Sequence, residues 1–432
     1  HGFWCGSTMR IAVVGAGIVG VTTAYELQCD GHEVVVFERR ASVAEETSFA
    51  NAGVVAPGYV APWAAPGMPR KMLGHLAGRH APLRIASVAA PGQWRWMWRW
   101  WRACDARTSA GNRACMHRLA RDSHDRLRAL SHDLRLEFER TDGYLVLLRS
   151  QRELKQARPG LKLLAELGET FHLVDATRAR QIEPGLNPGT PLHAAIHLPG
   201  ALVGNCRQFA HLLRLEAQRH GADFRFQHEV QRVEPGSKPS VHAIAGDTAA
   251  GTVAESFDAV VVCAALPSLS LLAPLGVRVP MIAVHGYSIT APLRHFEGHP
   301  DIGPRSSIMD EQYKVAISRL GQRVRVAGSA ELGGRLNAHN PAALGTLYKM
   351  LDDWFPGCAQ LAQVQAWKGA RPMMPDGPPV IGRAGPAGVW LNLGHGSSGW
   401  ALCAGSARLL ADLVAGHTPA IDPSGFTPDR LR

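Results

Sequence analysis

The stretch RIAVVGAGIVGVTTAYELQCDGHEVVVFER, residues 10–39, decides the fold. It begins with an apolar run, residues 11–14, which has the length and branching expected of a buried parallel strand. A glycine-rich turn G-x-G-x-x-G follows, and a helical stretch then extends to about Cys29. A second β-branched run, residues 34–37, ends in Glu38. The order strand, turn, helix, strand predicts the dinucleotide-binding unit of a Rossmann-like domain.

Each glycine of the turn has a physical role. Gly15 permits the tight turn, Gly17 lets the backbone approach a pyrophosphate, and Gly20 lets the helix pack against the strand. The helix N-terminus offers N–H groups and a positive dipole end to the pyrophosphate. Glu38 lies 18 residues past Gly20, where a carboxylate can accept hydrogen bonds from ribose hydroxyls. A bare G-x-G-x-x-G often marks only a tight turn, but this context favours a dinucleotide site, for NAD or FAD.

Length and composition narrow the class of protein. A chain of 432 residues usually divides into two or more domains. No apolar run approaches the ~18 residues of a membrane span. The eight cysteines are scattered without C-x-x-C or His/Cys clusters, so we expect no metal site and free thiols in a reducing, cytoplasmic compartment. Residues 1–8 precede Met9 without signal-peptide features, and we expect them to be a tag or a misplaced start, outside the fold.

The net charge of +10 comes mainly from arginine and is spread along the chain. It accompanies no nucleic-acid motif, so we expect no nucleic-acid partner. Attraction to an anionic membrane surface fits the charge equally well.

Residues 56–69, APGYVAPWAAPGMP, are rich in proline, glycine and aromatic residues. This composition excludes a regular helix or a central strand. A surface linker is one interpretation of such a segment. Tyr59 and Trp63 are costly to expose to water, so a loop that lines a pocket is the alternative.

In residues 93–102, QWRWMWRWWR, the arginines and tryptophans recur at helical spacing and form two neighbouring stripes along the predicted helix. One stripe is basic and the other aromatic: Arg95, Arg99 and Arg102, and Trp94, Trp98 and Trp101. The pattern favours an amphipathic helix that buries its tryptophans in the protein, with arginine stems lying over them. The alternative is an interfacial segment, because Trp and Arg both favour the lipid headgroup zone.

The second half of the chain repeats the opening pattern. Residues 257–266 resemble another buried strand, whose small residues Ala264 and Ala265 would let the chain pass close to a cofactor. Residues 281–330 alternate as strands and predict an antiparallel block in a second, inserted domain. Residues 389–416 then give strand, glycine-rich turn and helix. This second helix N-terminus favours FAD over NAD, because it could stabilise negative charge at the flavin N1–C2=O edge.

Six motifs carry a family resemblance that covers nearly the whole of residues 9–432. They are VVGAGIVGV, ETSFANAGVVAPGYVAPWAAPGMP, RHAPL, GYSIT, ARPMMPDGPPVIG and LNLGHGSSGW. In these motifs the chain resembles the small, FAD-containing subunits of bacterial D-amino acid dehydrogenases, within the D-amino acid oxidase/glycine oxidase superfamily of flavoproteins. One departure is Gly369-Ala370-Arg371-Pro372, where the family often has Gly-Leu-Arg-Pro.

The resemblance implies a set of FAD-binding residues in three groups, near the N-terminus, in the middle of the chain and near the C-terminus. They are Val14, Gly15, Gly17, Ile18, Val19, Gly20, Glu38, Arg39, Ser48, Asn51, Ala52, Gly53, Val230 and Ala264, then Gly394, His395, Gly396, Ser397, Ser398, Gly399 and Trp400. Relatives that attach FAD covalently use a cysteine near the Arg-Pro motif. None is present here, so the resemblance implies non-covalent FAD.

The resemblance also implies substrate-binding residues. Arg371 would grip the substrate carboxylate, and Tyr313 would help it. The remaining candidates are aromatic or imidazole side chains: Tyr59, Trp63, Tyr287 and His395. Glycine oxidases carry a second arginine after the Gly-His turn, where Ser397 and Ser398 stand here, so the carboxylate clamp would be looser or completed by another residue.

These expectations combine into an α/β fold. A Rossmann-like FAD-binding domain (9–66, 199–275 and 370–432) is interleaved with an α+β substrate domain on a mixed or antiparallel sheet (67–198 and 276–369). The expected activity is oxidative deamination of D-amino acids, D-alanine among them, to 2-oxo acids and ammonia. Once Arg grips the carboxylate, hydride transfer from the α carbon to flavin N5 needs no dedicated acid or base.

Three alternatives about partners stay open. Electrons would pass to a quinone or another respiratory acceptor, or directly to oxygen in an oxidase of the same fold. A third possibility is a flavin-binding subunit that mainly docks a partner or a membrane through residues 93–102. The expected location is the cytoplasm, in the third case peripheral on the inner membrane.

Overall fold

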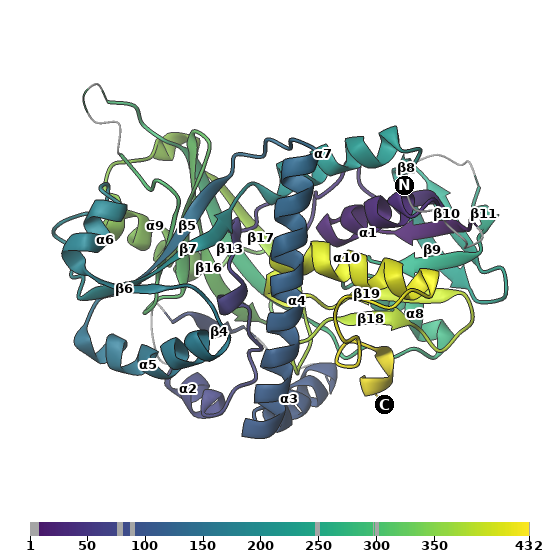
Figure 1. Ribbon diagram of the computed structural model, residues 1–432, viewed down its shortest axis with the longest axis horizontal. Coiled ribbons are helices and arrows are strands. Elements are labelled where there is room, and N and C mark those ends of the chain that lie inside the picture. Colours follow the sequence, from purple (N-terminus) through teal and green to yellow (C-terminus); the bar gives the residue numbers. More distant parts are fainter. Residues whose placement is uncertain are drawn as a thin grey trace.

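The computed structural model describes residues 8–75, 81–86, 91–246, 251–296, 298 and 302–431. Two large sheets lie side by side, and the long helix α4 (Ala106–Asp133) runs across the middle of the molecule between them (Figure 1). The half on the right of Figure 1 contains the chain's first strand and last long helix. The two ends of the sequence therefore meet in one half of the fold.

The smaller sheet has six strands in the order β18-β19-β12-β1-β2-β8. Their bounds are Arg10–Val14 (β1), Glu33–Glu38 (β2), Asp223–Phe226 (β8), Ala259–Val262 (β12), Val380–Arg383 (β18) and Val389–Leu393 (β19). All neighbouring pairs are parallel except β18 with β19. Burial on both faces explains why the strands are nearly continuous apolar runs.

Different elements cover the two faces of this sheet. Ile11 and Val13 point into a core shared with α1 (Ile18–Cys29), α7 (Cys206–Arg219) and α10 (Gly399–Ala415). Ala12 and Val14 point to the opposite face. That face is covered by a three-stranded sheet and a short helix: β9 (His228–Glu234), β10 (Ser240–Ala245), β11 (Val253–Ser256) and α8 (Ser268–Leu272).

The larger sheet has ten strands, eight of them in the order β17-β13-β16-β15-β14-β5-β7-β3. Their bounds are Val54–Val55 (β3), Thr141–Leu148 (β5), Ala194–Val203 (β7), Ile282–Pro292 (β13), Ser307–Asp310 (β14), Val315–Leu320 (β15), Arg323–Leu332 (β16) and Gln365–Met373 (β17). Strands β4 (Leu83–Ile85) and β6 (His172–Asp175) add to β16 and β7. The antiparallel block predicted for residues 281–330 is confirmed, since β13, β15 and β16 pair antiparallel.

The predicted domain boundaries at 199 and 370 fall within strands. Both β7 and β17 run through them as strands of the large sheet, and β3 also belongs to that sheet although it lies within 9–66. The chain therefore passes between the two halves along continuous strands. The remaining helices are α2 (Met68–His75), α3 (Pro91–Ala103), α5 (Gln151–Glu166), α6 (Ala176–Ile182) and α9 (Pro341–Trp354).

The strand register defines two faces of the large sheet. Arg371 pairs with Val284, whereas Lys368 pairs with Tyr287 three residues further along β13. Because strand side chains alternate, these pairs point to opposite faces. The face with Tyr287 is covered by α9, and we call it the α9 face. We call the other the inner face, because from it Arg325 donates to the carbonyl of Asn51 (2.9 Å), within the N-terminal segment of the FAD-binding half.

Helix α3 confirms the helix predicted over residues 93–102, but the prediction that it buries Trp94, Trp98 and Trp101 is wrong. These three side chains are 58%, 54% and 61% exposed. Trp96 and Trp100 are buried instead, and Trp96 Nε1 donates to the Met373 carbonyl (2.9 Å). The apolar side of the helix is thus the one that meets the end of β17.

Within the described residues, no helix is long and apolar enough to cross a membrane, and no cluster of side chains could hold a metal ion. The seven described cysteines are free thiols.

Candidate active site

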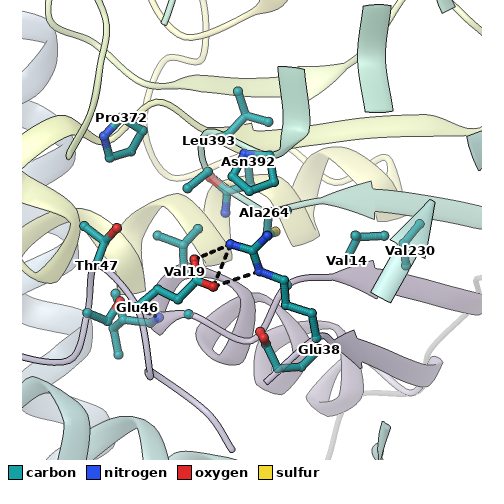
Figure 2. Close-up of a pocket in the computed structure, with 18 of the residues that line it drawn as sticks. Val14, Val19, Glu38, Glu46, Thr47, Val230, Ala264, Pro372, Asn392 and Leu393 are labelled. Carbon is teal, nitrogen blue, oxygen red and sulfur yellow. Dashed lines mark hydrogen bonds and ion pairs between the residues drawn. The ribbon is translucent and has the colours of Figure 1, made fainter. Parts of the chain in front are cut away.

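A deep cleft opens at the carboxyl ends of β1, β12 and β19, where the parallel strands meet the two glycine-rich turns (Figure 2). It encloses about 1310 Å³ of space, part of it open to solvent. The predicted cofactor residues that line it come from the N-terminal, central and C-terminal parts of the chain: Val14, Gly15, Gly17, Ile18, Val19, Glu38, Arg39, Ser48, Val230, Ala264, Gly394, His395, Gly396 and Gly399. The fold thus brings together two turns that lie more than 370 residues apart in sequence.

Position 15 requires glycine because of its backbone conformation and because neighbouring atoms leave no room for a Cβ. Its φ of +101° is a conformation that L side chains rarely adopt. A Cβ there would lie 3.0 Å from the Ala264 Cα and 3.1 Å from the Cys263 carbonyl oxygen. The turn therefore leaves the cleft floor as bare backbone, the surface that a pyrophosphate approaches.

Glu38 is held in a fixed orientation at the end of β2. Its carboxylate accepts hydrogen bonds from the backbone N–H groups of Ala16 (2.7 Å) and Arg40 (2.8 Å). Burial raises the pKa of Glu38, and these two hydrogen bonds oppose the rise. Beside it Arg39 donates to Glu46 at 2.7 and 2.8 Å, so an ion pair borders this end of the cleft.

Seven of the predicted cofactor residues do not line the cleft: Gly20, Asn51, Ala52, Gly53, Ser397, Ser398 and Trp400. Gly20 instead provides close packing, since a Cβ there would strike the Gly15 carbonyl. Trp400 is buried in the core with Nε1 donating to Gly53 (3.2 Å). The carbonyl of Ala52 accepts from Ser318 (2.7 Å). The segment 51–53 thus joins the cleft to the inner face of the large sheet.

Sequence reasoning missed Asn392, which lines the cleft from the last residues of β19. The side chain is 0% exposed, and its Nδ2 donates to Thr23 Oγ1 (3.0 Å). Its Oδ1 has no hydrogen-bond partner among the described residues. A buried amide oxygen without a partner is costly, and a polar group in the cleft would satisfy it. An asparagine just before the Gly394 turn was the only signal in the sequence.

His395 lies at the junction of the cleft and the large sheet, bridging to Met373. Its Nε2 is 2.9 Å from Ser406 Oγ, and burial lowers its pKa to about 3. The imidazole is therefore neutral throughout the physiological range and adds no charge to the site.

The cleft fits a dinucleotide with a flavin. The bare Gly15 turn and the α1 N-terminus suit the pyrophosphate, Glu38 suits a ribose, and Asn392 offers an unpaired acceptor deep in the cleft. Gly394 and Gly396, both at positive φ, bring the second turn to the far end. A flavin there would face Pro372, the neighbour of Arg371.

Arg371 lies on the inner face, next to that end of the cleft. Its Nη1 donates to the Ser329 carbonyl (3.1 Å), and it forms no ion pair with any described residue. Burial lowers its pKa to about 10, and no acidic group opposes the effect. The side chain is partly exposed, and a partly buried guanidinium without a counter-charge is a site that an anionic ligand can occupy.

Ser329 owes its position to a β-bulge. Two residues of β16, Ser329 and Ala330, stand opposite Gly286 of β13, and Ser329 has a φ of +56°. Bulges of this kind re-aim backbone groups and often lie beside active sites. Here the bulge coincides with the carbonyl that holds Arg371.

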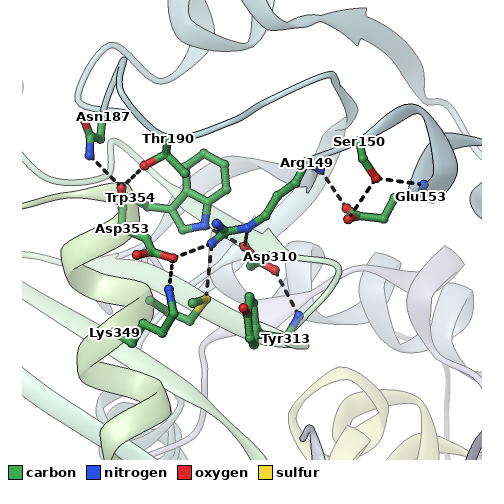
Figure 3. Close-up of polar contacts among 11 residues, drawn as sticks. Arg149, Ser150, Glu153, Asn187, Thr190, Asp310, Tyr313, Lys349, Asp353 and Trp354 are labelled. Carbon is green, nitrogen blue, oxygen red and sulfur yellow. Dashed lines mark hydrogen bonds and ion pairs between the residues drawn. The ribbon is translucent and has the colours of Figure 1, made fainter. Parts of the chain in front are cut away.

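Two tyrosines predicted to bind substrate, Tyr313 beside Arg371 and Tyr287 as a pocket or core residue, lie on the opposite face from Arg371. Tyr287 is buried on the α9 face and donates to Glu331 Oε2 (2.9 Å). Tyr313 packs against the same core, with its ring 5.3 Å from the Arg149 guanidinium, beside the Asp310 and Trp354 pair (Figure 3). The structure therefore assigns both tyrosines to packing and not to the carboxylate clamp. Single-sequence patterns could not reveal which face each would occupy.

The two aromatic residues of the proline-rich loop are partly buried, so the surface-linker interpretation is wrong for them. Trp63 packs in the cluster that contains Val284 and Met373, which flank Arg371. Tyr59 ends a short 3₁₀ turn, Pro57–Tyr59, and meets the ring of Tyr144 edge-on (5.9 Å). Trp63 is the one next to the residues around Arg371.

Comparison with known proteins agrees with this geometry. The family model described as FAD dependent oxidoreductase matches residues 10–413. The chain belongs to this family. Its fold and its dependence on FAD follow.

Curated relatives align over nearly the full chain. D-amino acid dehydrogenase of Cereibacter sphaeroides is 43% identical over 98% of this chain and 95% of its own length. D-amino acid dehydrogenase of Rhizorhabdus wittichii is 39% identical over 98% and 100%. Among solved structures, glycine oxidase from Geobacillus kaustophilus has a TM-score of 0.73 at 19% identity, covering 97% of this chain and 98% of its own. That similarity concerns the fold.

Proposed function

We propose that this oxidoreductase oxidatively deaminates D-amino acids, including D-alanine, to 2-oxo acids and ammonia, and passes the electrons to a quinone. The observation that carries the proposal is Arg371, a partly buried guanidinium without a counter-charge among the described residues, next to the end of the cleft where Pro372 lies. The names of the relatives that are 39–43% identical support the substrate class.

The residues of the chain position the substrate. Arg371 can hold an α-carboxylate bidentately, and the Ser329 carbonyl keeps the guanidinium in place. His395 stays neutral and so adds no positive charge beside that of Arg371. Bound FAD supplies the hydride acceptor for the α-hydrogen, provided that the amine is neutral. The FAD is held non-covalently in this proposal, through the cleft residues named above.

The test is anaerobic reduction of the purified yellow protein by D-alanine. Arg371→Ala should raise KM for D-alanine by about 30-fold or more, since loss of one partner of a buried charged pair costs about 2–5 kcal/mol. FAD content should be unchanged, because Arg371 does not line the cofactor cleft. Arg371→Lys keeps the positive charge but cannot bind a carboxylate bidentately, so its KM should lie between those of wild type and Arg371→Ala. An unchanged KM in Arg371→Ala, or no reduction by any D-amino acid, would refute the proposal.

The electron acceptor needs its own assay. Turnover with a quinone analogue and without peroxide supports the dehydrogenase. Stoichiometric peroxide formation in air, with no increase in rate when the quinone analogue is added, would instead show that the enzyme is an oxidase of the same fold.

We also propose that α3 holds the protein on an anionic membrane surface. The favouring observation is its exposed stripe of tryptophans, with Arg102 stacked over Trp98 (4.9 Å) and Arg95 exposed beside them. Exposed tryptophans beside arginines suit the headgroup zone of anionic lipid. Figure 1 places α3 at the lower edge of the molecule, at the end of α4.

The docking test uses sedimentation with vesicles of anionic or zwitterionic lipid. The double variant Trp98→Ala, Trp101→Ala should lose binding to anionic vesicles and keep its dye-coupled activity. Leu215→Ala, an exposed apolar side chain elsewhere (43%), is the matched control and should bind normally. Equal binding by the double variant would refute the docking role.

A further inference from the structure

Two glycines form an unusual pair on the inner face of the large sheet. Gly286 and Gly369 are direct cross-strand partners on β13 and β17. Arg371 lies two residues beyond Gly369 on the same strand, so it shares their face. A Cβ at position 286 would collide with the Arg371 guanidinium. The glycine therefore provides the space in which the guanidinium lies.

Trp367 occupies the neighbouring space. It lies two residues before Gly369, and a Cβ at position 369 would collide with the far, six-membered end of its indole. The indole thus folds back along β17 towards Arg371. The cation and the aromatic ring lie over adjacent glycines, on a floor that has no side chains of its own.

The surroundings of Trp367 are not those of a core residue. It is partly exposed and belongs to none of the hydrophobic clusters formed by the described residues. Its cross-strand partner is Ser288, which is 1% exposed and whose Oγ has no hydrogen-bond partner among the described residues. A large ring left out of the core, next to a buried hydroxyl without a partner, is typical of a binding compartment.

We propose that Trp367 is a specificity-determining residue, whose indole forms the wall that meets the substrate's side chain. This inference rests on the proposed function, since it takes the anion on Arg371 to be an amino-acid carboxylate. The α carbon is bonded to that carboxylate, so its side chain starts within reach of the ring. The indole then limits the size of the side chain and keeps water from the guanidinium.

The first test compares D-alanine with D-leucine and D-phenylalanine. Trp367→Ala should raise kcat/KM for the bulky substrates relative to D-alanine by about 10-fold or more, within the range for a reshaped apolar pocket. Trp367→Phe, a smaller ring, should lie between wild type and Trp367→Ala. An unchanged substrate ratio in Trp367→Ala, with FAD content intact, would overturn the inference.

The glycine pair supplies a second, matched test. Neither glycine has a positive φ, so alanine is compatible with the backbone at both positions. Gly286→Ala should displace Arg371 and raise KM for all D-amino acids by a similar factor. Gly369→Ala should displace Trp367 and change the ratio between small and bulky substrates. The same uniform effect from both variants would contradict the division of roles.

Carboxylates that cannot be oxidised provide a readout without turnover. Acetate and phenylacetate, added to the holoenzyme, should perturb the flavin absorption with different Kd values. Trp367→Ala should bind phenylacetate more tightly and so narrow the difference between the two Kd values. The same ratio of the two Kd values in wild type and Trp367→Ala would overturn the role proposed for the indole. If wild type binds these carboxylates but no D-amino acid reduces it, the proposed function fails while the size test on Trp367 is still decided.

Discussion

The cofactor cleft and the inner face of the large sheet are built in different ways. Each half of the cleft is a local unit, in which a strand runs into a glycine turn and then a helix: β1 with α1, and β19 with α10. The inner face is assembled from β13, β16 and β17, and it depends on their register. Local units can be predicted from sequence spacing, whereas a shared face requires knowledge of the pairing. The predictions below probe this contrast.

The largest effect on cofactor binding is expected at the local unit. Gly15→Val places a β-branched side chain at a φ of +101° and against the backbone of Ala264. FAD affinity should fall by about 100-fold or more, equivalent to about 3 kcal/mol. The measurement is the flavin-to-protein absorbance ratio across an FAD titration.

Gly31→Asn is the matched control for this substitution. Gly31 also has a positive φ (+81°), but no atom lies within 4 Å of the Cβ position. Asparagine tolerates this conformation, so FAD binding should be unaffected. Wild-type affinity in Gly15→Val would show that the turn does not carry the cofactor.

Much of the fold could be predicted, for identifiable reasons. The strand, turn and helix of residues 10–39 and the helix over residues 93–102 follow from local spacing, and the structure has β1, α1, β2 and α3 there. Asn392 could not be predicted, because its role follows from an unpaired oxygen in the folded cleft. The prediction of which α3 tryptophans are buried was wrong for a related reason. The helix has tryptophans on two sides, and tertiary packing against Met373 buries Trp96 and Trp100.

The second prediction concerns the α9 face, where a buried ion pair lies behind the active site. Lys368 Nζ donates to Glu331 (2.7 Å), with the two side chains only 1% and 4% exposed. Lys368 also donates to the carbonyls of Arg335 and Ala338 (2.8 Å each). Lys368→Met leaves the Glu331 charge buried without its cation, which should cost about 3–5 kcal/mol in the free energy of unfolding. Denaturant unfolding measures it.

The same pair predicts a pH dependence. Burial alone would raise the pKa of Glu331, but hydrogen bonds from Lys368, Tyr287 and Asn340 hold it below its ordinary 4.5. A lowered pKa stabilises the fold above pH 4.5, and this contribution is lost as the pH falls through the folded-state value. The melting temperature of wild type should therefore drop on acidification below about pH 4.5. Glu331→Gln should show a smaller drop, and an equal drop would exclude the pair as its source.

The third prediction tests the assignment of the tyrosines to the α9 face. Tyr287→Phe removes the donor to Glu331 and the acceptor of the Asn340 N–H (3.2 Å), so it should cost about 1–3 kcal/mol of stability. Its KM for D-alanine should change by less than about twofold, in contrast to Arg371→Ala. Tyr313→Phe keeps the ring over Arg149 and should likewise change KM by less than about twofold. A large rise in KM for either variant would return that tyrosine to the substrate site.

The smallest effect is expected on the exposed side of α3. Trp98 makes its described contact with Arg102 of the same helix, so Trp98→Ala should change stability by about 0.5 kcal/mol or less in the absence of lipid. Trp100→Ala, two residues away, should cost about 3–5 kcal/mol, because that ring is buried against the cluster around Val284. Similar costs for the two would mean that Trp98 is part of the folded core. A negligible cost for Trp98 together with lost vesicle binding would separate the surface role of this helix from its packing role.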